Sequence, residues 1–318
     1  MPESSPSEEA TLGPSRKTHN ARVLAFMVIL SFSCALILSI LASALAKPKE
    51  QAKDLERSKQ MMIAAKLLDY QGRFLIRNDE DKYIYAKYEK DGLLTPGTNK
   101  DYATNSQILD IHKRRIIPML VNEKGGLISF EKAGINPDDY LSKYKKSGYY
   151  AQPFKLIYKI LPNTVEEKKK NGKAADGYVI PINGFGLWDA IYGYLALKPD
   201  GNTVIGITWY EQKETPGLGA NIAEEPWQSL FPGKVIFQPD SQGRTDFKTA
   251  PLGIKVVKGK VSEVLGDIPK AKNAVDGMAG ATLTGNGVTD AYSTVLNAYR
   301  PFLIKLHENY LNKQTEAK

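Results

Sequence analysis

Residues 23–46 contain no charged side chain, and this apolar run constrains the fold more than any other feature of the chain. About 24 residues of helix span roughly 36 Å, which is enough to cross a hydrocarbon core of ~30 Å. A cleavable signal peptide is the competing interpretation, because residues 44–46 (Ala-Leu-Ala) resemble a processing site. The run is too long, and its polar leader too extended, for a typical signal peptide. We therefore expect a retained membrane helix at residues 22–46, after a disordered tail at residues 1–21.

Composition excludes several functional classes. The formal net charge is +8, but acidic residues are interleaved with the basic ones, and no basic stripe carries aromatic side chains, so we expect no nucleic-acid binding. The single cysteine, Cys34, lies within the apolar run, which excludes a disulfide or a thiolate-bound zinc or iron–sulfur centre within this chain. His19, His112 and His307 show no ligand spacing. We expect neither a metal site nor a catalytic residue in the chain itself.

Residues 47–150 read as a helical stalk followed by a mixed connector region. Apolar side chains recur on one face of residues 51–70, which predicts a helix that continues the anchor and ends at Gly72. A second helix is predicted at residues 106–120, bent or stopped near Pro118. We recognise no catalytic or ligand-binding motif in the connector region.

From residue 151 the pattern indicates a β-rich domain. Asn183-Gly184 and Asp200-Gly201 are typical of hairpin turns, which favours consecutive antiparallel strands. A helix with a long apolar face is expected from about Asn286, with a kink at Pro301. The fold class is therefore α+β, with an antiparallel-sheet domain at residues 151–318 closed by a C-terminal helix. Its predicted strands are residues 154–160, 177–182, 187–197 and 203–210.

Residues 276–287 form a small-residue loop that opens onto this helix and carries the hydroxyl of Thr282. A phosphate attached there would meet oriented N–H groups and a favourable helix dipole. Taken alone, the stretch is also typical of an ordinary helix cap. It resembles the flavinylation motif D-x-x-[ST]-G-A-T-x-T, in which the threonine matching Thr282 is esterified to the phosphate of FMN. Ala279 stands where that motif has Ser or Thr, which leaves the acceptor intact.

Three further stretches, residues 184–188, 214–219 and 256–259, share the order and approximate spacing of a known family. From about residue 177 to 288 the chain resembles the flavinylated C subunits of sodium-translocating NADH:quinone oxidoreductases. An isoalloxazine ring needs apolar side chains against its faces and polar groups at its rim. The resemblance implies that Trp188 and Leu218 supply the faces, although each is also typical of a core strand or a surface turn. The other implied flavin contacts are Glu214 and Thr215 at the ring or ribityl hydroxyls, Lys258 as a cation near the ring, and Gly280, Ala281, Leu283 and Thr284 beside the acceptor.

The resemblance also implies a maturation step and a role. No histidine base adjoins Thr282, so a separate flavin transferase is required, and Asp276 belongs to what that enzyme recognises. The covalent FMN would pass electrons from an iron–sulfur site to another flavin on the way to ubiquinone, coupled to Na⁺ export. The chain would act only as one part of the NADH:quinone oxidoreductase complex. It would be a single-pass protein of the bacterial inner membrane, with a cytoplasmic tail and a periplasmic C-terminal domain.

Two alternatives stay open at the level of sequence. The flavinylated subunit of the related ion-pumping ferredoxin:NAD oxidoreductase (Rnf-type) shares the anchor and the threonine motif, and its partners would distinguish it. A non-redox, membrane-anchored binding module would use Trp188 and the loop at residues 215–219 as a ligand surface. A yellow chromophore that survives denaturation would separate this module from both flavoproteins.

Overall fold

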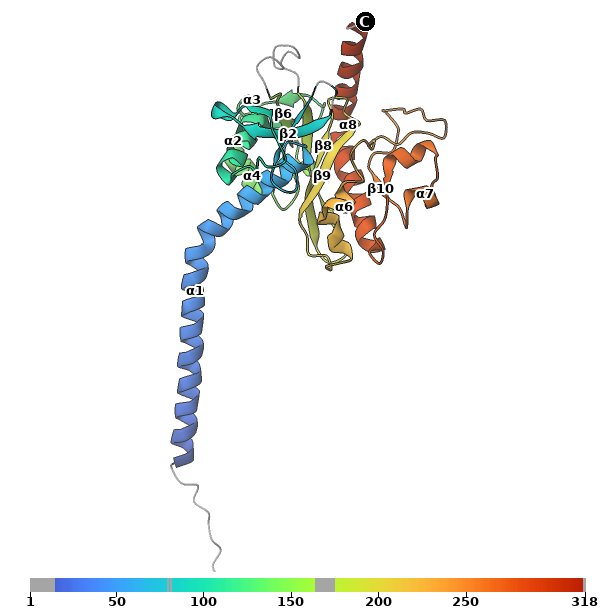
Figure 1. The fold of residues 1–318 in the computed structure, drawn as a ribbon. Coiled ribbons are helices and arrows are strands. Elements are labelled where there is room, and N and C mark those ends of the chain that lie inside the picture. Colours follow the sequence, from blue (N-terminus) through green and yellow to red (C-terminus); the bar gives the residue numbers. More distant parts are fainter. Residues whose placement is uncertain (1–14, 79, 81, 164–174, 317–318) are drawn as a thin grey trace, which may run out of the picture. The chain divides into compact units, whose positions relative to one another are not determined.

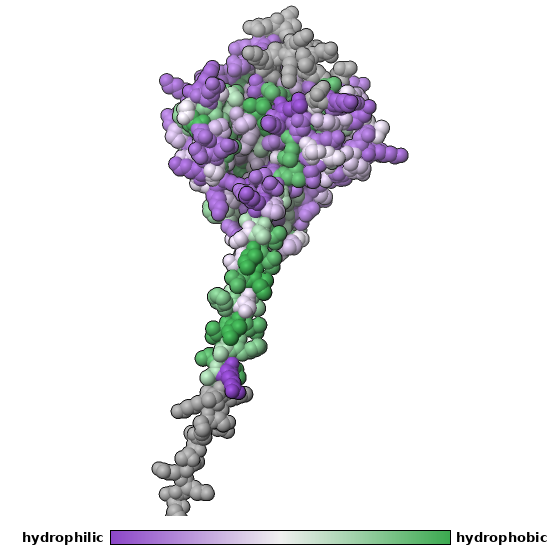
Figure 2. Space-filling model, turned by 90° about the vertical axis from the view of Figure 1, so that its left-hand side faces the viewer, coloured by the Kyte–Doolittle hydropathy of each residue, from purple (hydrophilic) through white to green (hydrophobic). Residues whose placement is uncertain are grey.

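The computed structural model describes residues 15–78, 80, 82–163 and 175–316, and it divides into two units, residues 1–54 and 55–318. Helix α1 (Ser15–Ala64) begins in the first unit and ends in the second. Its segment from Asn20 is long and apolar enough to cross a membrane, by length and composition. Figure 2 shows hydrophobic side chains along the exposed part of this helix. The apolar run and the segment predicted as a stalk thus belong to one continuous helix.

The stalk helix ends earlier than predicted. The last helical residue is Ala64, and Lys66 adopts a left-handed conformation with φ of 54°, so the chain turns there instead of at Gly72. A left-handed residue just after a helix is a common termination geometry. The final turns of α1 pack on the sheet of the second unit, where Gln60 O accepts a hydrogen bond from Thr208 Oγ1 at 3.1 Å.

The centre of the second unit is an antiparallel six-stranded sheet in the order β5-β4-β6-β7-β8-β9 (Figure 1). This arrangement confirms the predicted α+β class with consecutive antiparallel strands. Residues 55–318 form one compact unit, and a functional boundary at residue 151 stays a prediction. The strands are β4 (Ile116–Val121), β5 (Leu127–Ile128), β6 (Lys155–Ile160), β7 (Gly177–Phe185), β8 (Ala190–Leu197) and β9 (Val204–Glu211).

The predicted helix at residues 106–120 is wrong in its last five residues, which form a strand. Helix α2 (Asn105–Arg115) stops before Pro118, which lies in strand β4 opposite Tyr158 of β6. Strand β5 pairs only with Leu120 and Val121, so Pro118 has a sheet neighbour on one side alone. A proline is tolerated at such an edge position, and the apolar run around it is typical of a strand.

The hairpin predicted at Asn183-Gly184 is also displaced. Both residues lie within β7, opposite Tyr192 and Ile191, and the chain reverses at residues 186–189. Gly184 is needed for close packing and not for a turn, because a Cβ there would come within 2.5 Å of Ala291 Cβ in helix α8 (Thr282–Glu316). The other predicted hairpin, at residues 200–201, is confirmed between β8 and β9.

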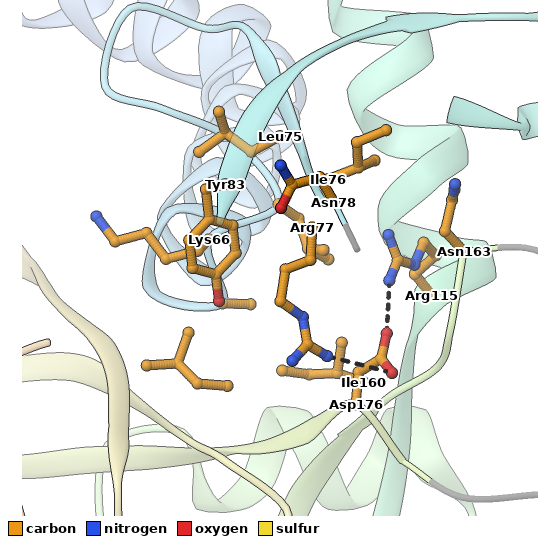
Figure 3. A pocket seen from close by; sticks show the side chains of 13 residues that line it. Lys66, Leu75, Ile76, Arg77, Asn78, Tyr83, Arg115, Ile160, Asn163 and Asp176 are labelled. Atoms are coloured by element: carbon orange, nitrogen blue, oxygen red, sulfur yellow. Dashed lines mark hydrogen bonds and ion pairs between the residues drawn. The ribbon is translucent and has the colours of Figure 1, made fainter. Parts of the chain in front are cut away.

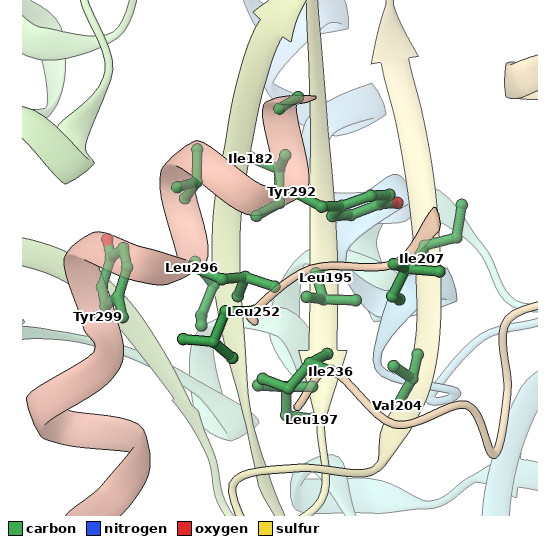
Figure 4. Packing of buried hydrophobic residues seen from close by; sticks show 14 of the residues in the cluster. Ile182, Leu195, Leu197, Val204, Ile207, Ile236, Leu252, Tyr292, Leu296 and Tyr299 are labelled. Carbon is green, nitrogen blue, oxygen red and sulfur yellow. The ribbon is translucent and has the colours of Figure 1, made fainter. Parts of the chain in front are cut away.

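Helix α8 (Thr282–Glu316) covers one face of the sheet. Figure 4 shows Tyr292 and Leu296 of this helix among side chains of the strands, with Ile182 and Leu195 in the same buried cluster. Tyr299 donates its hydroxyl to Leu156 O of β6 at 2.5 Å. The helix begins at Thr282 instead of Asn286, and it continues through Pro301. The smaller helices and strands are β1 (Phe74–Arg77), β2 (Tyr83–Tyr88), β3 (Leu94–Pro96), α3 (Phe130–Ala133), α4 (Pro137–Tyr144), α6 (Glu225–Gln228), β10 (Lys255–Val256), α7 (Val261–Val264) and β11 (Ala274–Val275).

Helix α2 contains a histidine that makes folding sensitive to acid. Among the described residues, none offers a hydrogen-bond partner to the buried Nε2 atom of His112, and burial lowers the pKa of its imidazole from 6.5 to about 4. Between these two values the unfolded chain therefore binds a proton that the folded chain does not bind. Since the folded-state pKa is depressed, stability falls as pH drops through this window, by about 2–3 kcal/mol at pH 4.

Replacing His112 with leucine removes the titratable group, and the apolar side chain of leucine occupies the space of the imidazole. For His112→Leu, we expect the free energy of unfolding to fall less steeply than that of the wild type between pH 7 and pH 4. Urea unfolding of the full chain in detergent, followed by intrinsic fluorescence, measures the difference. If the difference in free energy of unfolding between the two proteins did not change with pH, the titration of His112 would not be the cause of the acid sensitivity.

Candidate flavin site

Three segments that are distant in sequence meet at the start of α8. They are the hairpin loop at residues 186–189, the loop at residues 214–219 and the loop–helix junction at residues 276–287. A Cβ on Gly287 would lie 2.0 Å from Phe185 O, and one on Gly280 would lie 2.9 Å from Leu218 Cδ2. The motifs that the sequence suggested separately therefore lie side by side.

Glu214 joins these segments from a buried position, with 5% of its surface exposed. Its Oε2 accepts hydrogen bonds from Leu187 N at 3.1 Å and from Thr284 Oγ1 at 2.5 Å, and its Oε1 accepts one from Trp188 N at 3.0 Å. Burial acts to raise the pKa of Glu214, but these hydrogen bonds outweigh it and hold the pKa below its usual value. The carboxylate is thus charged at neutral pH. Its predicted contact with a flavin stays a prediction.

The loop at residues 214–219 presents an apolar side chain on a tight turn. Leu218 N donates to Thr215 O at 3.1 Å, with Pro216 at the second position and Gly217 at the third with φ of 76°. This is the sequence and geometry of a type II turn. Leu218 is left 41% exposed beside Gly280, where it can cover one face of a flat ligand.

Trp188 is positioned on the neighbouring loop. Its indole Nε1 donates to Thr215 Oγ1 at 3.1 Å, while 68% of the residue is exposed. Thr215 therefore orients the indole in this structure. Two neighbouring apolar residues were not among the predicted flavin contacts: Phe185, the last residue of β7, is 74% exposed, and Leu187 on the loop is 47% exposed. The sequence signal that could have identified them is that each follows a glycine, Gly184 or Gly186, in the same short stretch.

Thr282 and Thr284 occupy contrasting environments in the first turn of α8. Thr282 is exposed at the first helical position, where backbone N–H groups lack intrahelical acceptors. Thr284 is 1% exposed and donates its hydroxyl to Glu214. Gly280 precedes the helix with φ of 72°, and Ala281 is buried, whereas Leu283 is 60% exposed. An acceptor hydroxyl is therefore available at Thr282 and already engaged at Thr284.

Asp276 and Lys258 lie on two neighbouring loop segments. Gly277 N donates to Gly259 O at 2.8 Å, which brings the segment of the exposed Lys258 next to the loop that precedes Thr282. Asp276 Oδ1 accepts from Val261 N at 2.8 Å, so this carboxylate fixes the course of the segment that carries Lys258. Within the residues that the structure describes, no group of three or more His, Cys, Asp or Glu side chains is placed to hold a metal ion.

A separate polar cavity of about 260 Å³ has a different character (Figure 3). Arg115 and Arg77 both reach Asp176, at 3.1 and 3.5 Å. The cavity is lined by residues 65–67, 75–78 and 83 and by Arg115, Ile160, Asn163, Asp176 and Ile205, and none of the predicted flavin contacts borders it. We interpret its ion pairs as a structural link between β1, helix α2 and the segment before β7.

Comparisons with known proteins place these three segments within a known domain family. The FMN-binding domain family matches residues 186–297, which include all three segments of the site. The fold and the site therefore define a protein with an FMN-binding domain and an N-terminal helix that is long and apolar enough to cross a membrane.

Full-length relatives place the chain more narrowly. The C subunit of the Na(+)-translocating NADH-quinone reductase from Chlamydia pneumoniae is 41% identical over 93% of this chain and 94% of its own length. Its counterpart from Chlamydia caviae is 42% identical over 89% of this chain and 91% of its own length. The chain belongs to this family of C subunits of an oxidoreductase complex. The crystal structure of Shewanella oneidensis NqrC aligns with a TM-score of 0.45 and 27% identity, covering 64% of this chain and 89% of that one.

Proposed function

We propose that this chain carries one FMN through a phosphoester to the hydroxyl of Thr282. The observation that carries the proposal is the contrast between the exposed Thr282 at a helix N-terminus and the buried, hydrogen-bonded Thr284. Helix N-termini favour phosphate, because their free N–H groups and dipole both stabilise negative charge. Two exposed apolar side chains, Trp188 and Leu218, flank the junction and suit the faces of a flat ring.

The residues around the acceptor fit the group that they would hold. When bound, FMN supplies one-electron and two-electron redox chemistry. Trp188 and Leu218 would orient the ring and shield it from water, and Thr215 would fix the indole. Lys258 would place a cation near the ring and favour its reduced, anionic form. Gly280 keeps the approach to Thr282 free of a side chain.

Attachment needs a separate enzyme, because a threonine hydroxyl has a pKa far above neutral and requires an activating base. A metal-dependent flavin transferase would move FMN onto Thr282 and recognise the loop that Asp276 holds in place. The intact mass of the mature chain, produced with and without such a transferase, tests this step. A single flavin-phosphoester adduct that depends on the transferase is the expected result.

The role that we infer is electron relay within the sodium-pumping complex. The chain would receive electrons from an iron–sulfur site in the membrane subunits and pass them to another flavin on the way to ubiquinone, coupled to Na⁺ export. The names of relatives that match about nine-tenths of the chain favour this complex over the ferredoxin:NAD oxidoreductase. Co-purified partners provide the direct test.

For topology, we propose a retained anchor with the flavin domain on the periplasmic side of the inner membrane. An alkaline phosphatase fused after Lys318 should then be active, and a cytoplasmic reporter fused at the same position should be silent. Since the apolar run is retained, the mature N-terminus should precede residue 22. An inactive phosphatase fusion would show that the C-terminal domain lies in the cytoplasm. A mature N-terminus at Lys47 would show that the apolar run is a cleaved signal peptide.

A further inference from the structure

We propose that Glu214 is a positioning residue whose charged carboxylate clamps the two ring-facing loops to the first turn of α8 and lowers the midpoint potential of the flavin. The inference rests on attachment of FMN at Thr282. It gives Glu214 a role that acts through the protein instead of through direct contact with the ligand.

The clamp is visible in the bonds around the carboxylate. Two backbone donors come from the loop at residues 186–189, and the Thr284 hydroxyl comes from a position 70 residues further along the chain than Glu214. Trp188 is therefore connected to the helix that carries the acceptor through one carboxylate and two hydrogen bonds. If that link is broken, the indole and Thr282 can move independently.

Two glycines leave the space that this arrangement needs. A Cβ on Gly186 would lie 2.4 Å from Glu214 Oε1, and one on Gly219 would lie 2.5 Å from Thr284 Oγ1. Neither glycine has a positive φ, so their role here is close approach and not backbone freedom. Two separate loops thus come within contact distance of the hydrogen-bonded pair.

The charge of Glu214 has an electrical consequence. Three hydrogen bonds stabilise its ionised form, and burial weakens the screening that water would provide. A fixed negative charge near a flavin held at this site would oppose the arrival of an electron. Lys258 would act in the opposite direction, from the exposed segment beside the Asp276 loop. The balance between these two charges would set the potential at which the chain accepts electrons.

The experiment compares flavinylated full-length chains made with the transferase. We expect Glu214→Gln to raise the midpoint potential, with at least a tenfold change in the one-electron equilibrium, which is about 59 mV. We expect Glu214→Gln and Thr284→Val both to increase flavin fluorescence, because a loosened Trp188 quenches the ring less. Thr284→Ser keeps the hydroxyl and should restore the wild-type signal. Glu224→Gln, which changes an exposed glutamate without a side-chain capping bond, is the charge-matched control.

The outcomes separate the inference from the proposed function. Wild-type potential and fluorescence in flavinylated Glu214→Gln would overturn the clamp, and so would a lowered potential. A shift in Glu214→Gln with no change in Thr284→Val would show that Glu214 acts alone, again against the clamp. If Glu214→Gln does not fold, Thr284→Val still decides the question, since it removes one donor and keeps the side-chain shape. Wild-type chain without flavin would overturn the proposed function itself.

Discussion

Replacing Thr282 with alanine is expected to abolish covalent FMN, because no other hydroxyl at the start of α8 is both exposed and located at the helix N-terminus. Thr284 cannot substitute for it, since its hydroxyl is buried and bonded to Glu214. Thr282→Ala should therefore yield a folded chain without the flavin adduct. Intact mass and in-gel flavin fluorescence after denaturation measure the loss, which should be complete.

The matched control for this variant is Thr284→Ser, which retains a hydroxyl in the same turn. It should keep the adduct, and peptide mapping should place the flavin on the peptide that contains Thr282. Flavin recovered on another residue, or retained by Thr282→Ala, would refute the assignment. A chain that never acquires flavin with its transferase would favour the non-redox binding module.

Trp188→Ala and Leu218→Ala are expected to leave covalent FMN largely in place but to disturb its electronic environment. Attachment depends on the loop before α8, whereas ring packing depends on these two side chains. Burying one ring face contributes on the order of a few kcal/mol at ~25 cal/mol per Å². We expect an altered absorption spectrum, a shifted midpoint potential and slower quinone reduction by the assembled complex.

Val264→Ala provides a comparison, because Val264 is exposed and apolar but lies in α7, outside the three segments of the site. It should behave like the wild type in spectrum and turnover. If both Trp188→Ala and Leu218→Ala did so as well, neither side chain would be a ring contact. Trp188 would then be an exposed loop residue held by Thr215.

Local patterns predicted much of the fold, and they failed where long-range packing overrides them. The strands at residues 155–160 and 204–211 follow from runs of β-branched and aromatic residues. Pro118 by itself predicts the end of a helix, because nothing local reveals that β5 is too short to pair beside it. Asn183-Gly184 by itself predicts a turn, whereas the glycine is required by the close approach of Ala291, more than a hundred residues away.

The site shows the same limit. The turn at residues 215–218 could be predicted, since Pro and Gly fix its backbone. The difference between Thr282 and Thr284 could not be predicted, because it depends on a carboxylate 70 residues from Thr284. A motif identifies which residues belong to the site. Which of two threonines stays exposed and which is buried and hydrogen-bonded depends on partners that only the folded chain brings together.

The end of the anchor helix has a mechanical consequence for the site. Ala64 O lies so close to β9 that a Cβ on Gly206 would come within 2.6 Å of it, and β9 runs on toward the loop that holds Glu214. The last turns of α1 are thus built into the body that carries the flavin loops. Pro48 interrupts the backbone hydrogen bonding of the same helix between the apolar run and these buried turns. A bend of the helix at Pro48 would therefore leave the geometry of the proposed flavin loops unchanged.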